Sequence, residues 1–314
     1  MRWTTTVLLV TALAGAAAGQ PGPAAKKAQA GKPEEELGTL IARRIQRATG
    51  VKVRIRKLVY ELFTSTFVGE RIAVGPAGRP YVVIPDLKVE LSLLAKGPGA
   101  TVALVEVRKP RLRARAAWLK RIYRFPVHRQ TTVRVGRLVG GHATIEVDGG
   151  QIVLDGLALT VEGLNVPVTR AGTPPAVTGD VSLRAAHVRI GALALKDLAL
   201  DGTLTGKALE VKRLSLGLPG GAATLAGSVG FGGKRGPGPV DLSGSFKAAI
   251  DGGATLAGTI RISGKTLDNL VLGGKVEGGK LPARGGLEGA PALDLRMRAG
   301  RRRLRGTLRG WRLR

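Results

Sequence analysis

Residues 51–56 read VKVRIR and residues 87–93 read LKVELSL. In both stretches every second residue is apolar, and the residues between them are charged or polar. A period of two places the apolar side chains on one face of a β-strand and the polar side chains on the other. These stretches therefore predict a mainly β fold, an elongated and twisted antiparallel sheet with one apolar face.

The same alternation continues after Thr132 in short segments separated by Asp-Gly and Gly-Gly pairs, for example Asp155-Gly156 and Asp201-Gly202. Glycine adopts positive φ without strain, so these pairs favour hairpin turns. The intervals between the pairs vary, which predicts a β-meander and not an exact repeat. With 47 glycines and 4% aromatic residues, the chain favours many turns and an extended sheet over long helices.

One short amphipathic helix is expected near the N-terminus. Residues 34–36 are glutamates, which favour a helix N-terminus, and Gly50 is a natural end. The helix either caps one end of the sheet or lies on a membrane surface. Apolar residues recur at helical spacing between these ends: Leu37, Leu40, Ile41, Ile45 and Ala48.

The first 19 residues have the layout of a secretory signal peptide. Arg2 precedes an uncharged run, residues 3–19, that ends in small residues, and cleavage is expected after Ala18 or Gly19. A weak membrane anchor is the alternative, although the run is short and rich in Ala and Gly for a spanning helix. Either interpretation predicts an exported protein.

Positive charge is concentrated in two blocks of the chain, whose formal net charge is +28. Residues 43–137 hold 22 basic and 5 acidic residues, and residues 293–314 hold 9 basic and 1 acidic residue. Such asymmetry indicates an anionic partner, a membrane surface or a nucleic acid, or else a solvated cationic face. We expect five regions: 1–19 signal peptide or weak membrane anchor, 20–33 flexible linker, 34–137 basic helix plus β region, 138–292 Gly-rich β-meander, and 293–314 Arg-rich tail, which forms a last pair of strands or a disordered end.

Motifs for catalysis or metal binding are missing from the sequence. There is no cysteine, and His128, His142 and His187 lack metal-ligand spacing, so each is interpreted as a strand or loop residue. Gly264-Lys265-Thr266 resembles the end of a phosphate loop, but Gly258 precedes it at the wrong spacing. We therefore predict no enzyme, no catalytic or metal-binding residue and no cofactor.

Five longer stretches follow one another in a distinctive order. They read ATGVKVRIRKL (48–58), DLKVELSLL (86–94), VEVRKPRLRAR (105–115), VRVGRLVGGHATIEVDGGQIVLDGLALTVEGL (133–164) and LALDGTLTGKALEVKRLSLGLPGGAATLAGSV (198–229). This order resembles the AsmA family of Gram-negative envelope proteins, relatives of the bridge-like lipid transfer proteins. The resemblance extends over about residues 35–279 and rests on loose patterns of Gly, Asp and apolar residues.

The resemblance implies a taco-like sheet with an apolar groove and a role in phospholipid movement or outer-membrane assembly. It also implies a periplasmic location, with or without association with the inner membrane, and no catalytic residues. Members usually keep an N-terminal membrane helix and are usually longer. These departures favour a shuttle, an accessory or a subunit of a longer assembly over a complete bridge.

We expect phospholipid or an anionic membrane surface as the partner, with another envelope protein as a further candidate. Apolar residues of the alternating segments are the hypothetical groove lining: Val51, Val53, Ile55, Leu87, Val89, Leu91, Leu93, Leu157, Leu159, Leu214 and Leu216. Basic residues are the hypothetical contacts to anionic headgroups: Arg43, Arg44, Arg47, Arg111, Arg113, Arg115, Lys120, Arg121, Arg124, Arg301, Arg302, Arg303 and Arg305.

Two other functions fit parts of the sequence. A structural scaffold with a closed β-sandwich core, binding another envelope protein, needs no ligand. A nucleic-acid binder is indicated by the charge, by RGTLRGWRLR (305–314) and by the aromatic residues among cations near Trp118, but the export signal argues against it.

Overall fold

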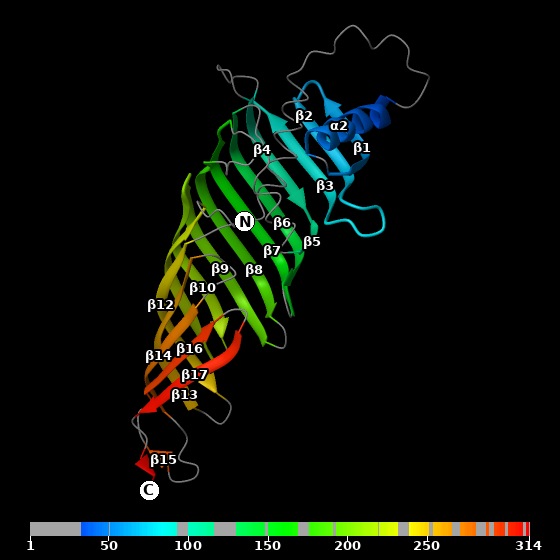
Figure 1. Cartoon of the computed structure of the whole chain (residues 1–314). Coiled ribbons are helices and arrows are strands. Elements are labelled where there is room, and N and C mark those ends of the chain that lie inside the picture. Colours follow the sequence, from blue (N-terminus) through cyan, green and yellow to red (C-terminus); the bar gives the residue numbers. More distant parts are fainter. Residues whose placement is uncertain are drawn as a thin grey trace. The chain divides into compact units, whose positions relative to one another are not determined.

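The structure is a computed structural model whose strands and single short helix dominate the described part of the chain (Figure 1). The predicted mainly β class is thus confirmed. The expected signal segment and the aromatic segment 116–129 lie outside the described residues. Described are residues 33–49, 51–92, 100–115, 130–147, 150–168, 176–190, 193–218, 220–231, 239–250, 254–265, 271–280, 287–288, 292–298, 301–309 and 312–313.

The chain divides into two compact units, Met1–Asp180 and Val181–Arg314. The boundary expected from charge, between residues 137 and 138, falls inside a strand of unit 1 and marks a change of composition only. The elements of unit 1 are α2 (Pro33–Thr49), β1 (Val53–Glu61), β2 (Thr66–Val74), β3 (Val82–Leu91), β4 (Ala100–Arg108), β5 (Arg111–Arg115), β6 (Thr131–Val147) and β7 (Gly150–Val166).

The sheet of unit 1 is mixed, which corrects the expectation of a purely antiparallel sheet. Its strand order is β1-β2-β3-β4-β6-β7, and β5 continues the line of β4 between β3 and β6. Both β4 and β5 pair with β6 in parallel. Parallel neighbours need a connection of about a dozen residues or more, and residues 116–130 supply that length. Alternation alone could not reveal this, because parallel and antiparallel strands share a period of two.

The strands of unit 2 form the predicted meander, in which each long strand from β9 onward pairs antiparallel with its neighbour, and β8 lies between β7 and β9. Its Arg-rich end forms strands, which decides between the two expectations for that segment. The strands are β8 (Thr178–Ile190, which begins in unit 1), β9 (Leu193–Thr205), β10 (Ala208–Leu218), β11 (Gly221–Gly230), β12 (Val240–Ile250), β13 (Ala254–Gly264), β14 (Val271–Lys280), β16 (Ala292–Arg298) and β17 (Arg301–Arg309), with the short pair β15 (Leu287–Glu288) and β18 (Arg312–Leu313).

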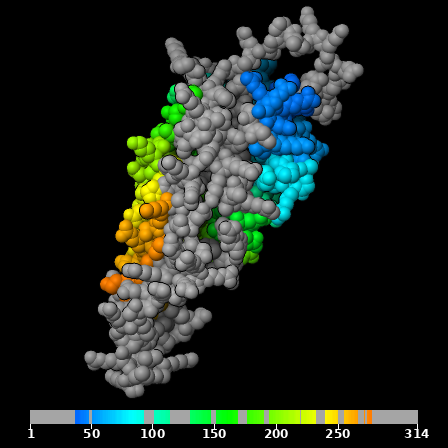
Figure 2. Space-filling model, viewed as in Figure 1, coloured from blue at the N-terminus to red at the C-terminus, as the bar shows by residue number. Residues whose placement is uncertain are grey.

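Helix α2 packs against the edge strand β1, and the blue atoms of this part form one continuous surface in Figure 2. Ile41, Ala42 and Ile45 are buried. A Cβ added at Gly38 would lie 3.3 Å from Ile55 Cγ2, so the helix approaches the strand closely there. The apolar face of α2 is therefore used to cover the sheet edge, as the cap interpretation predicts. The placement of Leu40 on that face was wrong, because its side chain is 62% exposed.

Candidate functional site

One face of the unit 1 sheet is apolar across six strands. Residues paired side by side form rows perpendicular to the strands, and none of the rows below contains a charged side chain. The rows are Val53, Val74, Val82, Leu112, Ala143 and Leu154; Leu58, Gly69, Leu87, Val107, Leu138 and Leu159; and Tyr60, Phe67, Val89, Val105, Gly136 and Val161.

Residues on this apolar face are deeply buried. Leu58, Ile72, Val89, Val102 and Val161 are each 0% exposed. Among the described helices and strands, extensive packing across the face is limited to α2 on β1. Each of these side chains contributes about 1.5–3 kcal/mol by leaving water, so the apolar face is a large part of what stabilises unit 1.

The apolar face stays continuous because each strand carries an extra residue. After the buried Thr66 at its start, the buried positions of β2 are Phe67, Gly69, Ile72 and Val74, a step of three between two steps of two. The extra residue there, Arg71, has a φ of 49°. The register does not shift there, because β1 and β3 each carry a matching extra residue at the same level, Arg56 and Pro85. We call such a position a bulge; it keeps the apolar side chains on one face and bends the strand.

The bulges of neighbouring strands lie at adjacent levels. The register skips the position where Arg71 of β2 meets Pro85 of β3. Next along the sheet come Lys109, between β4 and β5, with a φ of 47°, and Gly140 of β6, with a φ of 65°. Gly156 of β7 continues the line with a φ of 62°. Together these bulges form a crease across the sheet, which curves its apolar face.

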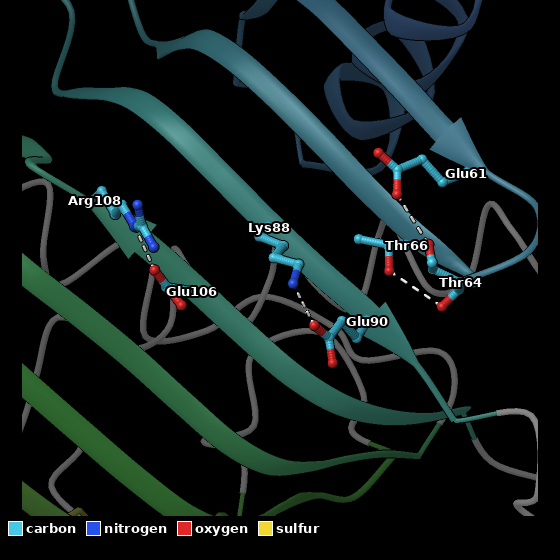
Figure 3. Close-up of polar contacts among 7 residues, drawn as sticks. All are labelled: Glu61, Thr64, Thr66, Lys88, Glu90, Glu106 and Arg108. Carbon is cyan, nitrogen blue, oxygen red and sulfur yellow. Dashed lines mark hydrogen bonds and ion pairs between the residues drawn. The ribbon is translucent and has the colours of Figure 1, made fainter.

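The opposite face of the sheet is polar. Lys57 contacts Glu70 at 3.4 Å and Lys88 contacts Glu90 at 2.6 Å, and Arg108 pairs with Glu106 (Figure 3). The hydrogen bond and charge of Glu90 raise the pKa of Lys88 above its ordinary value. These pairs are exposed and contribute about 0–1 kcal/mol each at most. They keep this face soluble rather than forming a reactive site.

Nearly all predicted groove residues of unit 1 lie on the apolar face. Val53, Leu87, Val89, Leu157 and Leu159 are buried, and the half-buried ones are Val51, Ile55 and Leu91. Leu93 lies outside the described residues.

The two predicted groove residues of unit 2 lie on β10. Leu214 packs against a buried cluster of Val211, Leu225, Val240 and Leu242. Leu216 is half-buried and pairs with Ala223 of β11. Unit 2 therefore repeats the apolar face, with more exposed side chains than in unit 1.

The predicted headgroup contacts occupy several elements. On α2 the side chains of Arg43, Arg44 and Arg47 are exposed. On β5 Arg111 is exposed, and Arg113 contacts Glu146 at 3.0 Å. The remaining candidates comprise Arg115 at the end of β5, Lys120, Arg121 and Arg124, which lie outside the described residues, and Arg301, Arg302, Arg303 and Arg305 of β17.

Sequence reasoning missed several of the most buried residues, including Leu58, Ile72, Val102, Val107 and Leu164. A search for strict alternation fails at each bulge, because the apolar pattern steps by three there. The pattern that finds these residues is a series of apolar residues spaced two, three and two positions apart, with the step of three at the bulge.

Neither of the two described histidines belongs to a group of metal ligands. His142 of β6 contacts the Asp155 carboxylate through Nδ1 and Thr144 Oγ1 through Nε2, the latter at 3.2 Å. The His142 and Asp155 side chains are nearly half exposed beside the crease, which fits the predicted strand role. His187 lies in β8, and His128 is outside the described residues.

Among the described residues, no group of three or more His, Asp or Glu side chains could hold a metal ion. The helix that the structure describes is not long and apolar enough to cross a membrane. Comparison of the chain with protein-family models, with curated proteins and with solved structures finds no match.

Proposed function

We propose that the apolar face of unit 1 binds phospholipid acyl chains, and that the protein carries or holds lipid without catalysing a reaction. One observation carries the proposal, namely the three uncharged rows that run across six strands. Acyl chains match such a surface, because each methylene removed from water contributes about 0.8 kcal/mol.

The charge of the chain supports a phospholipid over a neutral lipid. The formal net charge is +28, and the exposed arginines of α2 and β5 lie outside the apolar rows. Cations near a membrane surface attract anionic headgroups by about 1 kcal/mol each. The AsmA resemblance agrees with this proposal and adds an envelope location, which stays a prediction.

A structural scaffold is the second candidate. The complete burial of residues such as Leu58 and Val89 favours a closed core, in which protein and not lipid covers the face. The two candidates differ in whether phospholipid co-purifies with the protein and is recovered from it by lipid extraction.

The test is native mass spectrometry, with lipid extraction, of protein purified from the envelope fraction. Leu91 and Val83 are both half-buried on β3 but lie on opposite faces. We expect phospholipid to co-purify with the wild type and with Val83→Asp, and to be lost from Leu91→Asp. A lipid-free wild type with a sharp thermal transition, unchanged by added lipid, would support the scaffold instead.

A further inference from the structure

The turn between β1 and β2 displays two apolar side chains to solvent. Leu62 is 76% exposed and Phe63 is 105% exposed, more than any other large hydrophobic residue described. Neither residue takes part in the apolar face. An aromatic and a leucine exposed side by side at the apex of a turn form a candidate interaction site.

The turn is held in shape by hydrogen bonds, so the exposure is a fixed feature. The Ser65 N–H donates to Leu62 O at 3.3 Å, with Ser65 at a φ of 50°. Thr64 Oγ1 donates to the Glu61 carboxylate at 3.0 Å, and Thr66 Oγ1 donates to Thr64 O at 3.1 Å (Figure 3).

The base of the turn is anchored to the sheet. Ser65 and Thr66 are 3% and 2% exposed, and the Leu91 N–H of β3 donates to Ser65 O at 3.0 Å. The apex therefore projects from a firm base, with the apolar side chains of Leu62 and Phe63 at its end and the exposed Thr64 beside them.

Size and charge favour a lipid layer as the partner. Two side chains cannot supply the roughly 800 Å² that each partner buries in a stable protein interface. A convex apolar apex instead fits a deformable acyl layer. Of the two nearby carboxylates, Glu90 is paired with Lys88. Glu61 accepts a hydrogen bond from the Thr64 hydroxyl and keeps its charge, so insertion of the apex leaves Glu61 at the level of the headgroups.

We propose that Leu62 and Phe63 form an insertion tip that enters the acyl layer of a phospholipid bilayer and docks the β1–β2 end of unit 1 on it. The tip deepens the proposed function, because it places the membrane beside one end of the apolar face. It does not depend on that face being filled with lipid, so the two proposals fail separately.

A single fluorophore tests insertion directly, because the chain has no cysteine. Phe63→Cys is labelled with a polarity-sensitive dye and mixed with phosphatidylcholine–phosphatidylglycerol vesicles. The matched control is Ala77→Cys, which is exposed in the turn at the opposite end of β2. We expect a blue shift, and quenching by lipid carrying a nitroxide on its acyl chain, at position 63 only.

A second variant measures the contribution of the tip. Leu62→Ser with Phe63→Ser is expected to weaken vesicle binding about tenfold or more, while Val139→Ser, at a residue 52% exposed on the polar face, leaves it unchanged. Uptake of a monomeric lysophospholipid by the apolar face stays the same in both variants.

Three outcomes would overturn the proposal that Leu62 and Phe63 insert into the bilayer. One is a label at position 63 that stays in water on protein bound to vesicles. Another is vesicle binding unchanged by the double substitution. The third is a blue shift that appears without vesicles as protein concentration rises, which would indicate a second copy as the partner. A wild type that takes up no lysophospholipid would contradict the proposed function but not the proposal of an insertion tip.

Discussion

At the scale of single residues, Gly227 of β11 shows how closely the strands of unit 2 approach one another. Its φ is 143°, a region that other residues rarely adopt, and an added Cβ would collide with Asp241 O of β12. Gly273 of β14 differs, because the nearest atom to an added Cβ, Arg261 O, is 3.9 Å away.

We predict that Gly227→Ala lowers the free energy of unfolding by about 1–3 kcal/mol, through backbone strain and the collision. Gly273→Ala should be neutral or slightly stabilising, because it only restricts the unfolded chain. Urea denaturation of both variants checks this, and equal effects would show that the φ of Gly227 is not as described.

The Asp201–Arg184 pair predicts a small pH dependence of stability. Partial burial raises the pKa of Asp201, but hydrogen bonds from Ser182 and Arg184 and the arginine charge outweigh it, so the pKa lies below its usual value. A depressed folded-state pKa stabilises the protein above the unfolded-state pKa, near 4, and this stability is lost as pH falls through the folded-state value.

We therefore expect the wild type to lose its advantage over Asp201→Asn as pH falls from about 5 through the lowered folded-state pKa. Because the pair is about half exposed, the difference should be below about 1 kcal/mol. Parallel urea titrations at each pH measure it. A gap between wild type and variant that widens toward low pH would contradict this sign.

At the scale of strands, alternation at 51–56 and 87–93 predicted the sheet and its apolar face correctly. It could not predict the bulges. In the sequence a residue such as Arg71 looks like any other polar residue, and only its positive φ shows that it is an extra residue. It also could not predict that β4 and β5 pair in parallel with β6. The burial of Leu40 was predicted wrongly, because apolar residues at helical spacing are compatible with more than one buried face of the helix.

The bulge in β2 makes a testable prediction. Deleting Arg71 shifts Ile72 and Val74 to the polar face, because a slip of one residue reverses every later side chain. Both are buried, at 0% and 5% exposed, so we expect loss of cooperative thermal unfolding. Deletion of Gly78, exposed in the β2–β3 turn, is the control and should fold; similar melting of both proteins would argue against the bulge.

At the scale of the whole molecule, positive charge should govern attachment to membranes. Replacing Arg43, Arg44 and Arg47 of α2 by alanine should weaken binding to phosphatidylglycerol vesicles by about fivefold per charge. Binding to pure phosphatidylcholine should be unaffected, and added salt should remove the difference. Lys57→Ala, which removes a cation paired with Glu70, is the control, and an equal loss there would indicate a nonspecific charge effect.

The central claim is that acyl chains lie on the apolar face of unit 1. The most direct measurement uses a phospholipid with a photoreactive acyl chain, cross-linked to the purified full-length protein and mapped by peptide mass spectrometry. Our account predicts adducts on the apolar rows, for example at Val89, Val105 and Val161. Adducts confined to polar-face residues such as Lys88 and Glu106, or no adducts at all, would contradict it.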